Sequence, residues 1–198
     1  GVFAEQGEEV MRAIKFAIDE ANAKGGVDGR KVEFQEADDE GTPDAGRRVA
    51  EKLARDGYNL LIGAIPSSIS LAIAQNLDRR DAAYFVVASK SDKITGDTCK
   101  PRAFRTNHAD NMDIAMINQW AKNLPGKTYA VMAADYVWGR DSGESFKKAA
   151  EAMGKTVPLT LYAPLGTKDF SPYIAQLKAA NVDAVWVAET GRDASAFV

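Results

Sequence analysis

The sequence predicts an α/β protein of two similar lobes, each a doubly wound parallel sheet, joined by a hinge. The first observation behind this prediction is an internal repeat, in which residues 42–63 recur as residues 167–187. Each copy has the pattern of a capped amphipathic helix, a Gly or Asn where the helix ends, and a short apolar strand. The second observation is that most predicted strands are unbroken apolar runs, as in parallel strands covered on both faces. Paired lobes bring the carboxyl ends of two sheets together, where small molecules bind.

We assign residues 1–106 to the first lobe. Its first helix, over residues 10–23, has apolar side chains at helical spacing and ends at Gly25 and Gly26, which tolerate the left-handed backbone of a helix end. Thr42 then caps a second helix. The other elements expected in this lobe are strands over residues 31–36, 60–64 and 83–87, a helix over residues 67–77, and a short extended segment over residues 103–106.

We assign residues 107–198 to the second lobe. The polar loop over residues 89–101 is the expected crossing between the lobes. The pattern then predicts helices over residues 110–124, 142–153 and 167–180, strands over residues 128–134, 157–162 and 184–188, and the start of another helix over residues 191–198. We expect the fold to be incomplete at both ends, because the first helix has no strand before it and the last helix is cut short.

The composition favours a globular protein with an ordinary core. The chain has 198 residues, 45% of them hydrophobic, and its net charge of -3 gives no basic footprint for nucleic acid. The uncharged stretch over residues 59–77 contains Pro66 and three serines, which fits a strand, a turn and a helix start rather than a membrane span. No signal peptide is present in this sequence. The single cysteine, Cys99, cannot form a disulfide within the chain.

Enzyme signatures are weak throughout the sequence. Gly-Lys-Thr occurs at Gly126 and Gly154, but a phosphate-binding loop needs a glycine five positions earlier, and both places hold alanine. His108 is the only histidine, so a histidine-based triad or metal site would depend on one residue. We therefore expect no catalytic residue, no metal and no cofactor. An α/β enzyme stays open as an alternative that would need a second histidine or a metal cluster in further sequence.

Candidate site residues in the first lobe follow two predicted strands. Ser67 and Ser68 come after the strand over residues 60–64, where hydroxyl and amide groups at a helix start can bind a carboxylate. The alternative is that Ser67 only caps the helix. The next strand is followed by Ala88, Ser89 and Lys90, which offer backbone groups, a hydroxyl and a cation, although an ordinary polar loop would look similar.

In the second lobe, Trp138 follows the strand over residues 128–134 and precedes a glycine at a helix start. It can form an apolar wall of a ligand cleft, or it can pack inside its own lobe. Glu189 and Thr190 follow the strand over residues 184–188. Glu189 can pair with an ammonium group or stand as an exposed loop carboxylate.

The chain resembles the type I periplasmic solute-binding proteins of ABC importers, in particular the branched-chain amino-acid (Leu/Ile/Val) binding family. The resemblance covers essentially the whole sequence and is carried by residues 19–27, 38–39, 62–68, 88–95, 104–106, 138–139 and 166–173. It implies that Ser67 binds a ligand carboxylate together with backbone groups of residues 88–90. It also implies that Trp138 covers the ligand and that Thr190 contributes from the next strand end.

The resemblance implies an extracytoplasmic solute-binding component of an ABC importer that closes around a small carboxylate-bearing solute. That solute is a branched-chain or other aliphatic amino acid, or an aromatic or other organic acid. The implied partner is a membrane permease. The protein is expected to be periplasmic or to be an extracytoplasmic lipoprotein, and to be a monomer. Lys90 stands where amino-acid binders have threonine, and Gln6 replaces a common aromatic residue, although Phe3 is close by. A ligand-sensing domain of a membrane receptor or signalling protein would share this fold and is the alternative.

Overall fold

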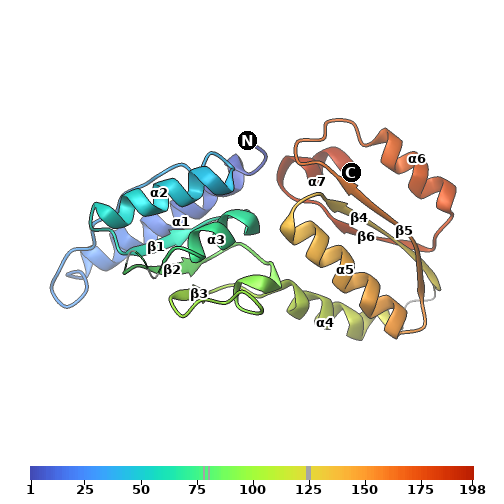
Figure 1. The fold of residues 1–198 in the computed structure, drawn as a ribbon, viewed down its shortest axis with the longest axis horizontal. Coiled ribbons are helices and arrows are strands. Elements are labelled where there is room, and N and C mark those ends of the chain that lie inside the picture. The colour runs from blue at the N-terminus through green and yellow to red at the C-terminus, as the bar shows by residue number, and fades with distance from the viewer. Residues whose placement is uncertain (78, 80, 124–125) are drawn as a thin grey trace.

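The computed structural model describes residues 1–77, 79, 81–123 and 126–198, and in it helices alternate with parallel strands. Two α/β units lie side by side, one ending at β3 and the other beginning at α4 (Figure 1). The elements are, in chain order, α1 (Ala4–Ala23), α2 (Pro43–Arg55), β1 (Leu60–Gly63), α3 (Ser67–Ala74), β2 (Ala83–Val86), the 3-10 helix η2 (Asp92–Ile94), β3 (Ala103–Arg105), α4 (Asp110–Ala121), β4 (Thr128–Ala134), α5 (Val137–Ala152), β5 (Thr156–Ala163), α6 (Ser171–Ala180), β6 (Ala184–Ala188) and α7 (Gly191–Phe197).

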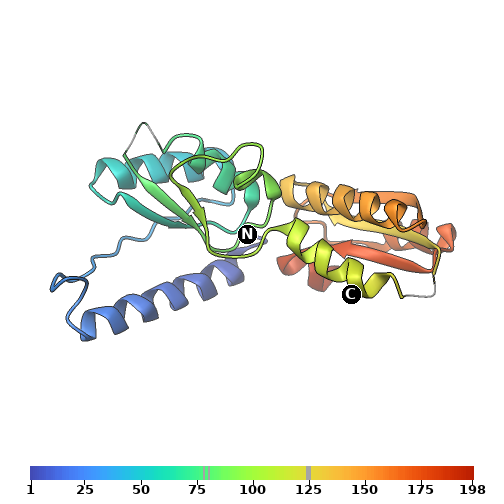
Figure 2. The ribbon, with the colours of Figure 1, turned by 90° about the horizontal axis from the view of Figure 1, so that it is seen from below.

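The first unit contains a parallel three-stranded sheet in the order β1-β2-β3. Helices α2 and α3 cover one of its faces (Figure 2). The core on this side joins Ile69 and Ile73 of α3 to Leu61, Tyr84 and Val86 of the sheet, all of them buried. The segment predicted as extended over residues 103–106 is the third strand of this sheet.

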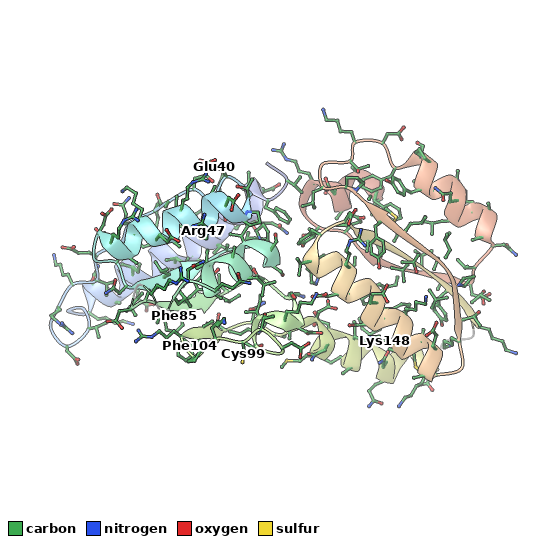
Figure 3. The ribbon with its side chains drawn as sticks, viewed as in Figure 1. Glu40, Arg47, Phe85, Cys99, Phe104 and Lys148 are labelled. Carbon is green, nitrogen blue, oxygen red and sulfur yellow. The ribbon has the colours of Figure 1, made fainter. Side chains whose placement is uncertain are left out.

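The opposite face of the first sheet is apolar and open. Leu60 and Ile62 of β1 are 76% and 45% exposed, and Phe104 of β3 is 48% exposed. The rings of Phe85 and Phe104 stack on this face at 5.5 Å between centroids (Figure 3). Helix α1 lies on the same side but away from the sheet (Figure 2), and none of its residues is buried.

The second unit contains a parallel sheet in the order β5-β4-β6. Its central strand, β4, is buried along nearly its whole length. Phe146 and Ala150 of α5 pack on one face of the sheet, and Leu177 of α6 and Phe197 of α7 pack on the other. This arrangement confirms the predicted α/β class with parallel sheets, and it is doubly wound in the second unit.

The strand predicted over residues 31–36 is wrong. This segment has no β ladder and is tied to α1 by side chains. Asn22 donates to Val32 O and accepts from Val32 N at 3.0 and 2.7 Å, and Lys15 forms an ion pair with Glu36. A strand needs a neighbouring strand to bond its backbone, and within the described residues β1 pairs only with β2. The alternating pattern of residues 31–36 therefore has no sheet edge to join.

Several predicted helix ends also move. The helix predicted over residues 67–77 ends at Ala74, and the one predicted from residue 142 begins at Val137. The helix predicted over residues 110–124 ends at Ala121, and its predicted last residue lies outside the described residues. Two helix-end predictions are confirmed: Thr42 Oγ1 accepts from Ala45 N at 3.3 Å, and Asn181 adopts the left-handed conformation with φ of 47°.

The two copies of the internal repeat both form a helix followed by a parallel strand, α2 with β1 and α6 with β6. Their starts differ, because Thr167 donates its hydroxyl proton to Pro164 O and does not cap α6, which begins at Ser171. Across the described part of the chain, no helix combines the length and apolarity needed to cross a bilayer.

Candidate functional site

Ser67 is the first residue of α3, directly after the turn that leaves β1. It does not cap the helix, because Pro66 holds the capping position, so the alternative reading of this serine is wrong. The side chain is buried, and its Oγ accepts a hydrogen bond from Ser91 N at 3.1 Å. The hydroxyl proton of Ser67 is thus left to donate to another acceptor. Ser68 follows and is only partly buried.

Ser89 holds together the ends of β1 and β2. Its buried Oγ lies 3.0 Å from Ala64 O, 2.9 Å from Ile65 O and 2.7 Å from Ser70 Oγ. Its carbonyl oxygen accepts from Arg105 Nη1 at 2.7 Å. Both polar groups of Ser89 are therefore engaged inside the first unit, which fixes the path of the loop beside the partly buried Ala88.

Lys90 is paired with a carboxylate of α4. Its Nζ lies 2.8 Å from Asp113 Oδ2, and its carbonyl oxygen accepts from Asp110 N at 2.9 Å. Asp113 also lies 3.1 Å from His108 Nε2 through its other oxygen. The charge of Lys90 is balanced by Asp113, so its presence does not by itself favour an anionic ligand.

Trp138 lies in the first turn of α5 and is half-buried. Its Nε1 donates to Asp110 Oδ1 at 2.9 Å, and its ring packs against the core of the second unit. The ring of Tyr136 lies 6.0 Å from that of Trp138 and also 6.0 Å from that of Phe3. A row of three aromatic rings thus connects the start of α1 to the start of α5.

The glycine after Trp138 is required by a close backbone approach. A Cβ at Gly139 would lie 2.1 Å from Ala134 O, far inside the contact distance. Helix α5 can therefore begin immediately beyond β4 only with glycine at this position. The sequence Trp-Gly at a helix start places the Trp138 side chain on a fixed backbone.

Burial changes the acidity of the groups around this aromatic row. The pKa of Asp110 is raised to about 6, mainly by burial, although the hydrogen bond from Trp138 opposes the rise. The pKa of Tyr136 is raised by burial and by the nearby carboxylates of Glu189 and Asp110. The region behind the rings thus holds carboxyl groups that are partly shielded from water.

Asp141 connects the two units. This residue of α5 accepts from Ser91 Oγ at 2.5 Å and from Lys93 Nζ at 2.8 Å. Since Ser91 N also donates to Ser67 Oγ, one residue joins Ser67 of the first unit to the helix that carries Trp138. Neither Ser91 nor Asp141 was predicted from the sequence. The only signal was an acidic residue one helical turn after Trp138, and its partners are 48 and 50 positions away.

A hollow of about 450 Å³ lies between the start of α1 and the junction of β6 with α7. It brings together Gln6 of α1 and Thr190 of the β6–α7 junction, both expected at the site, on its two sides. Its lining residues are Glu5, Gln6, Glu9, Glu189, Thr190, Gly191, Arg192, Ala194 and Ser195. The other expected residues, Ser67, Ser68, Ala88, Ser89, Lys90 and Trp138, are not part of this lining.

Parallel strands that end at a shared junction, with a hydrogen-bonded link and a hollow beside it, define a two-unit α/β ligand-binding protein. The chain belongs to the periplasmic binding protein family, whose model matches residues 1–198. This is a family of solute-binding proteins and not of enzymes. The match confirms the resemblance drawn from the sequence.

Individual relatives support the same placement. The Leu/Ile/Val-binding protein BraC3 of Rhizobium johnstonii is 27% identical over 187 residues, which are 94% of this chain and 51% of the relative. A solute-binding protein of an ABC transporter from Rhodopseudomonas palustris BisB5, solved with 3,4-dihydroxybenzoic acid, is 28% identical with a TM-score of 0.87 over 97% of this chain and 52% of that one. A substrate-binding protein of Desulfitobacterium hafniense, solved with Leu, is 25% identical with a TM-score of 0.73 over 91% of this chain and 54% of that one. The chain thus spans about half the length of these relatives.

Proposed function

We propose that the protein is the solute-binding component of an ABC importer and holds a small carboxylate-bearing solute between lobes formed by residues 1–106 and 107–198. The observation that carries this proposal is the link from Ser67 through Ser91 to Asp141. It places the start of α3 beside the start of α5, at the carboxyl ends of strands from both sheets. Relatives named for Leu, Ile and Val, and structures solved with Leu or a benzoic acid, support a solute of this size.

In this proposal the first lobe binds the solute carboxylate. Ser67 donates its hydroxyl proton to the carboxylate, since the bond from Ser91 N engages Ser67 Oγ only as an acceptor. Backbone N–H groups from Ala88 to Lys90 and the hydroxyl of Ser68 complete the set of donors. Hydrogen bonds to a charged group of this kind are each worth about 1.5–3 kcal/mol.

The second lobe covers the rest of the solute. Trp138 supplies an apolar ring, Thr190 contributes a polar group from the same lobe, and Gln6 of the first lobe lies across the hollow from Thr190. Closure of the two lobes brings these contacts together. The solute stabilises the closed form because it binds that form more tightly than the open form. No bond is made or broken, so neither a catalytic residue nor a cofactor is required.

The importer role also implies a partner and a place. The closed protein would deliver its solute to a membrane permease from the outer side of the membrane, as a periplasmic protein or a lipid-anchored one. A monomer is sufficient, because a single chain supplies both walls of the site.

Replacement of Ser67 by Ala in the complete protein tests the carboxylate contact. We expect binding of L-leucine or 3,4-dihydroxybenzoate, measured by titration calorimetry, to weaken about tenfold or more. Trp138→Ala should weaken it as well, through lost apolar contact. Ser171→Ala, at an exposed serine of α6, is the matched control and should leave affinity unchanged. Unchanged affinity in both site variants, with folding intact by circular dichroism, would remove this site assignment.

A further inference from the structure

Asp110 is a buried carboxylate at the point where the chain passes from the first unit to the second. It is the first residue of α4, which begins just beyond β3 and lies along α5 (Figure 1). Only 2% of its surface is exposed. A carboxylate is almost never buried this deeply unless it is paired, so the contacts of this side chain indicate its role.

The two ends of Asp110 contact different halves of the proposed site. Its backbone N–H donates to Lys90 O at 2.9 Å, and Lys90 belongs to the loop assigned above to the solute carboxylate. Its Oδ1 accepts the indole N–H of Trp138 at 2.9 Å. One residue therefore fixes the aromatic ring of the second lobe relative to the carboxylate-binding loop of the first.

The hydrogen bond from the indole gives the Trp138 ring a defined orientation. Tryptophan has one polar atom, Nε1, which can only donate. With Nε1 bonded to Asp110 and the ring packed on the core beside Tyr136, the polar edge of the ring faces the carboxylate. Trp186, which packs on the same core, donates instead to Ser142 Oγ at 3.2 Å, so the two indoles have separate acceptors.

We propose that Asp110 is a positioning residue of the solute site, which holds the ring of Trp138 through its indole N–H in the orientation that covers the solute. This inference rests on the proposed function and deepens it. A phenylalanine at position 138 would keep an apolar ring but offer no N–H to the buried carboxylate. Asp110 and Trp138 should therefore act as a unit.

A carboxylate in the first turn of a helix can also have a purely structural role, because it interacts favourably with the helix dipole. In that role Asp110 would stabilise α4 whatever ring stands at position 138. The two roles are separated by replacing Asp110 in the presence and in the absence of the indole N–H.

The test is a double-mutant cycle in the complete protein, with L-leucine and 3,4-dihydroxybenzoate as probes in titration calorimetry. Asp110→Ala should weaken probe binding about fivefold or more when Trp138 is present, and less than about twofold in the Trp138→Phe background. Asp110→Asn keeps an oxygen that can accept the indole N–H, so it should retain most of the affinity. It is measured in both backgrounds, so that the test still decides if Asp110→Ala fails to fold.

The indole N–H resonance of Trp138 gives a second readout that needs no solute. In ¹⁵N-labelled protein, the peak that Trp138→Phe removes belongs to this N–H. The pKa of Asp110, raised mainly by burial, is about 6, so the acceptor is ionised at pH 8 and protonated at pH 5. Because a hydrogen bond to an ionised acceptor is the stronger one, the peak should move between these pH values, and it should stay in place in Asp110→Asn.

Other titratable groups surround Asp110 and are distinguished from it by the Asp110→Asn variant. Asp92 of η2 and Asp113 of α4 add to the effect of burial on its pKa, and Tyr136 approaches from the start of α5. His108 lies 3.1 Å from Asp113, and histidine titrates in the same pH range. A movement of the indole peak that persists in Asp110→Asn would come from one of these groups.

The matched control is Asp44→Ala, which removes an exposed carboxylate from the first turn of α2 and should change neither the affinity nor the peak. The positioning role is overturned by equal losses of affinity in both backgrounds, by unchanged affinity in Asp110→Ala, or by a peak that still moves in Asp110→Asn. In each of these cases, binding that depends on Ser67 leaves the proposed function standing. If neither probe binds, the proposed function is contradicted and this inference with it.

Discussion

β4, the central strand of the second sheet, and β1, an edge strand of the first sheet, are both apolar but differ in their surroundings. β4 is an apolar run whose residues from Tyr129 to Ala134 are at most 4% exposed, with helices on both faces. β1 is an apolar run too, yet Leu60 and Ile62 lie on an open face and only Leu61 points into a core. The comparison teaches that an apolar strand pattern reports what a strand can bury, whereas its neighbours decide what it does bury.

The largest expected effect comes from truncating one side chain in each strand. Met132→Ala removes a side chain that is fully buried in β4, so we expect the free energy of unfolding to fall by about 2–5 kcal/mol. Ile62→Ala removes a half-exposed side chain from β1 and should cost less than about 1 kcal/mol. Urea denaturation followed by circular dichroism measures both. Equal losses would mean that the open face of β1 is covered in solution.

The next largest effect compares two glycines of the first unit, one in α2, which covers the sheet, and one in α1, which lies away from it. A Cβ at Gly46 of α2 would lie 2.4 Å from Cγ2 of the buried Ile69, so Gly46→Ala should destabilise by about 1–3 kcal/mol. A Cβ at Gly7 of α1 would have no atom within 4 Å. Gly7→Ala should therefore stabilise the protein by up to about 1 kcal/mol, because alanine has the higher helix propensity. Thermal unfolding of the two variants gives the sign of each change. A destabilised Gly7→Ala variant would show that α1 packs closely against another segment.

The smallest expected effect is at the link between the units. Asp141→Asn keeps the shape of the side chain but weakens its bonds to Ser91 and Lys93. We expect solute affinity to fall about three- to tenfold, because the two lobes of the proposed site lose charge-assisted hydrogen bonds that join them, while stability changes little. Glu144→Gln, at an exposed acid of the same helix, serves as the control. An Asp141→Asn variant with full affinity would mean that this link does not contribute to closure.

The sequence predicted what depends on local patterns. Thr42 caps α2, Asn181 ends α6 in the left-handed region, and the apolar run of β4 forms a central parallel strand. Residues 31–36 were misassigned because an alternating pattern does not reveal whether a neighbouring strand exists. Ser91 and Asp141 were not predicted for a related reason, because their role comes from a contact between residues 50 positions apart.

The close approach at Gly139 bears on how binding preference can change in this protein. α5 rests against the last carbonyl of β4 with no space for a methyl group, so the backbone that carries Trp138 keeps this place only with glycine at position 139. In the proposed site, the most direct way to change the apolar wall is to exchange the aromatic side chain of Trp138 and keep Gly139. A small set of replacements at that single position, with the scaffold held constant, would be enough to survey which guest sizes the wall admits.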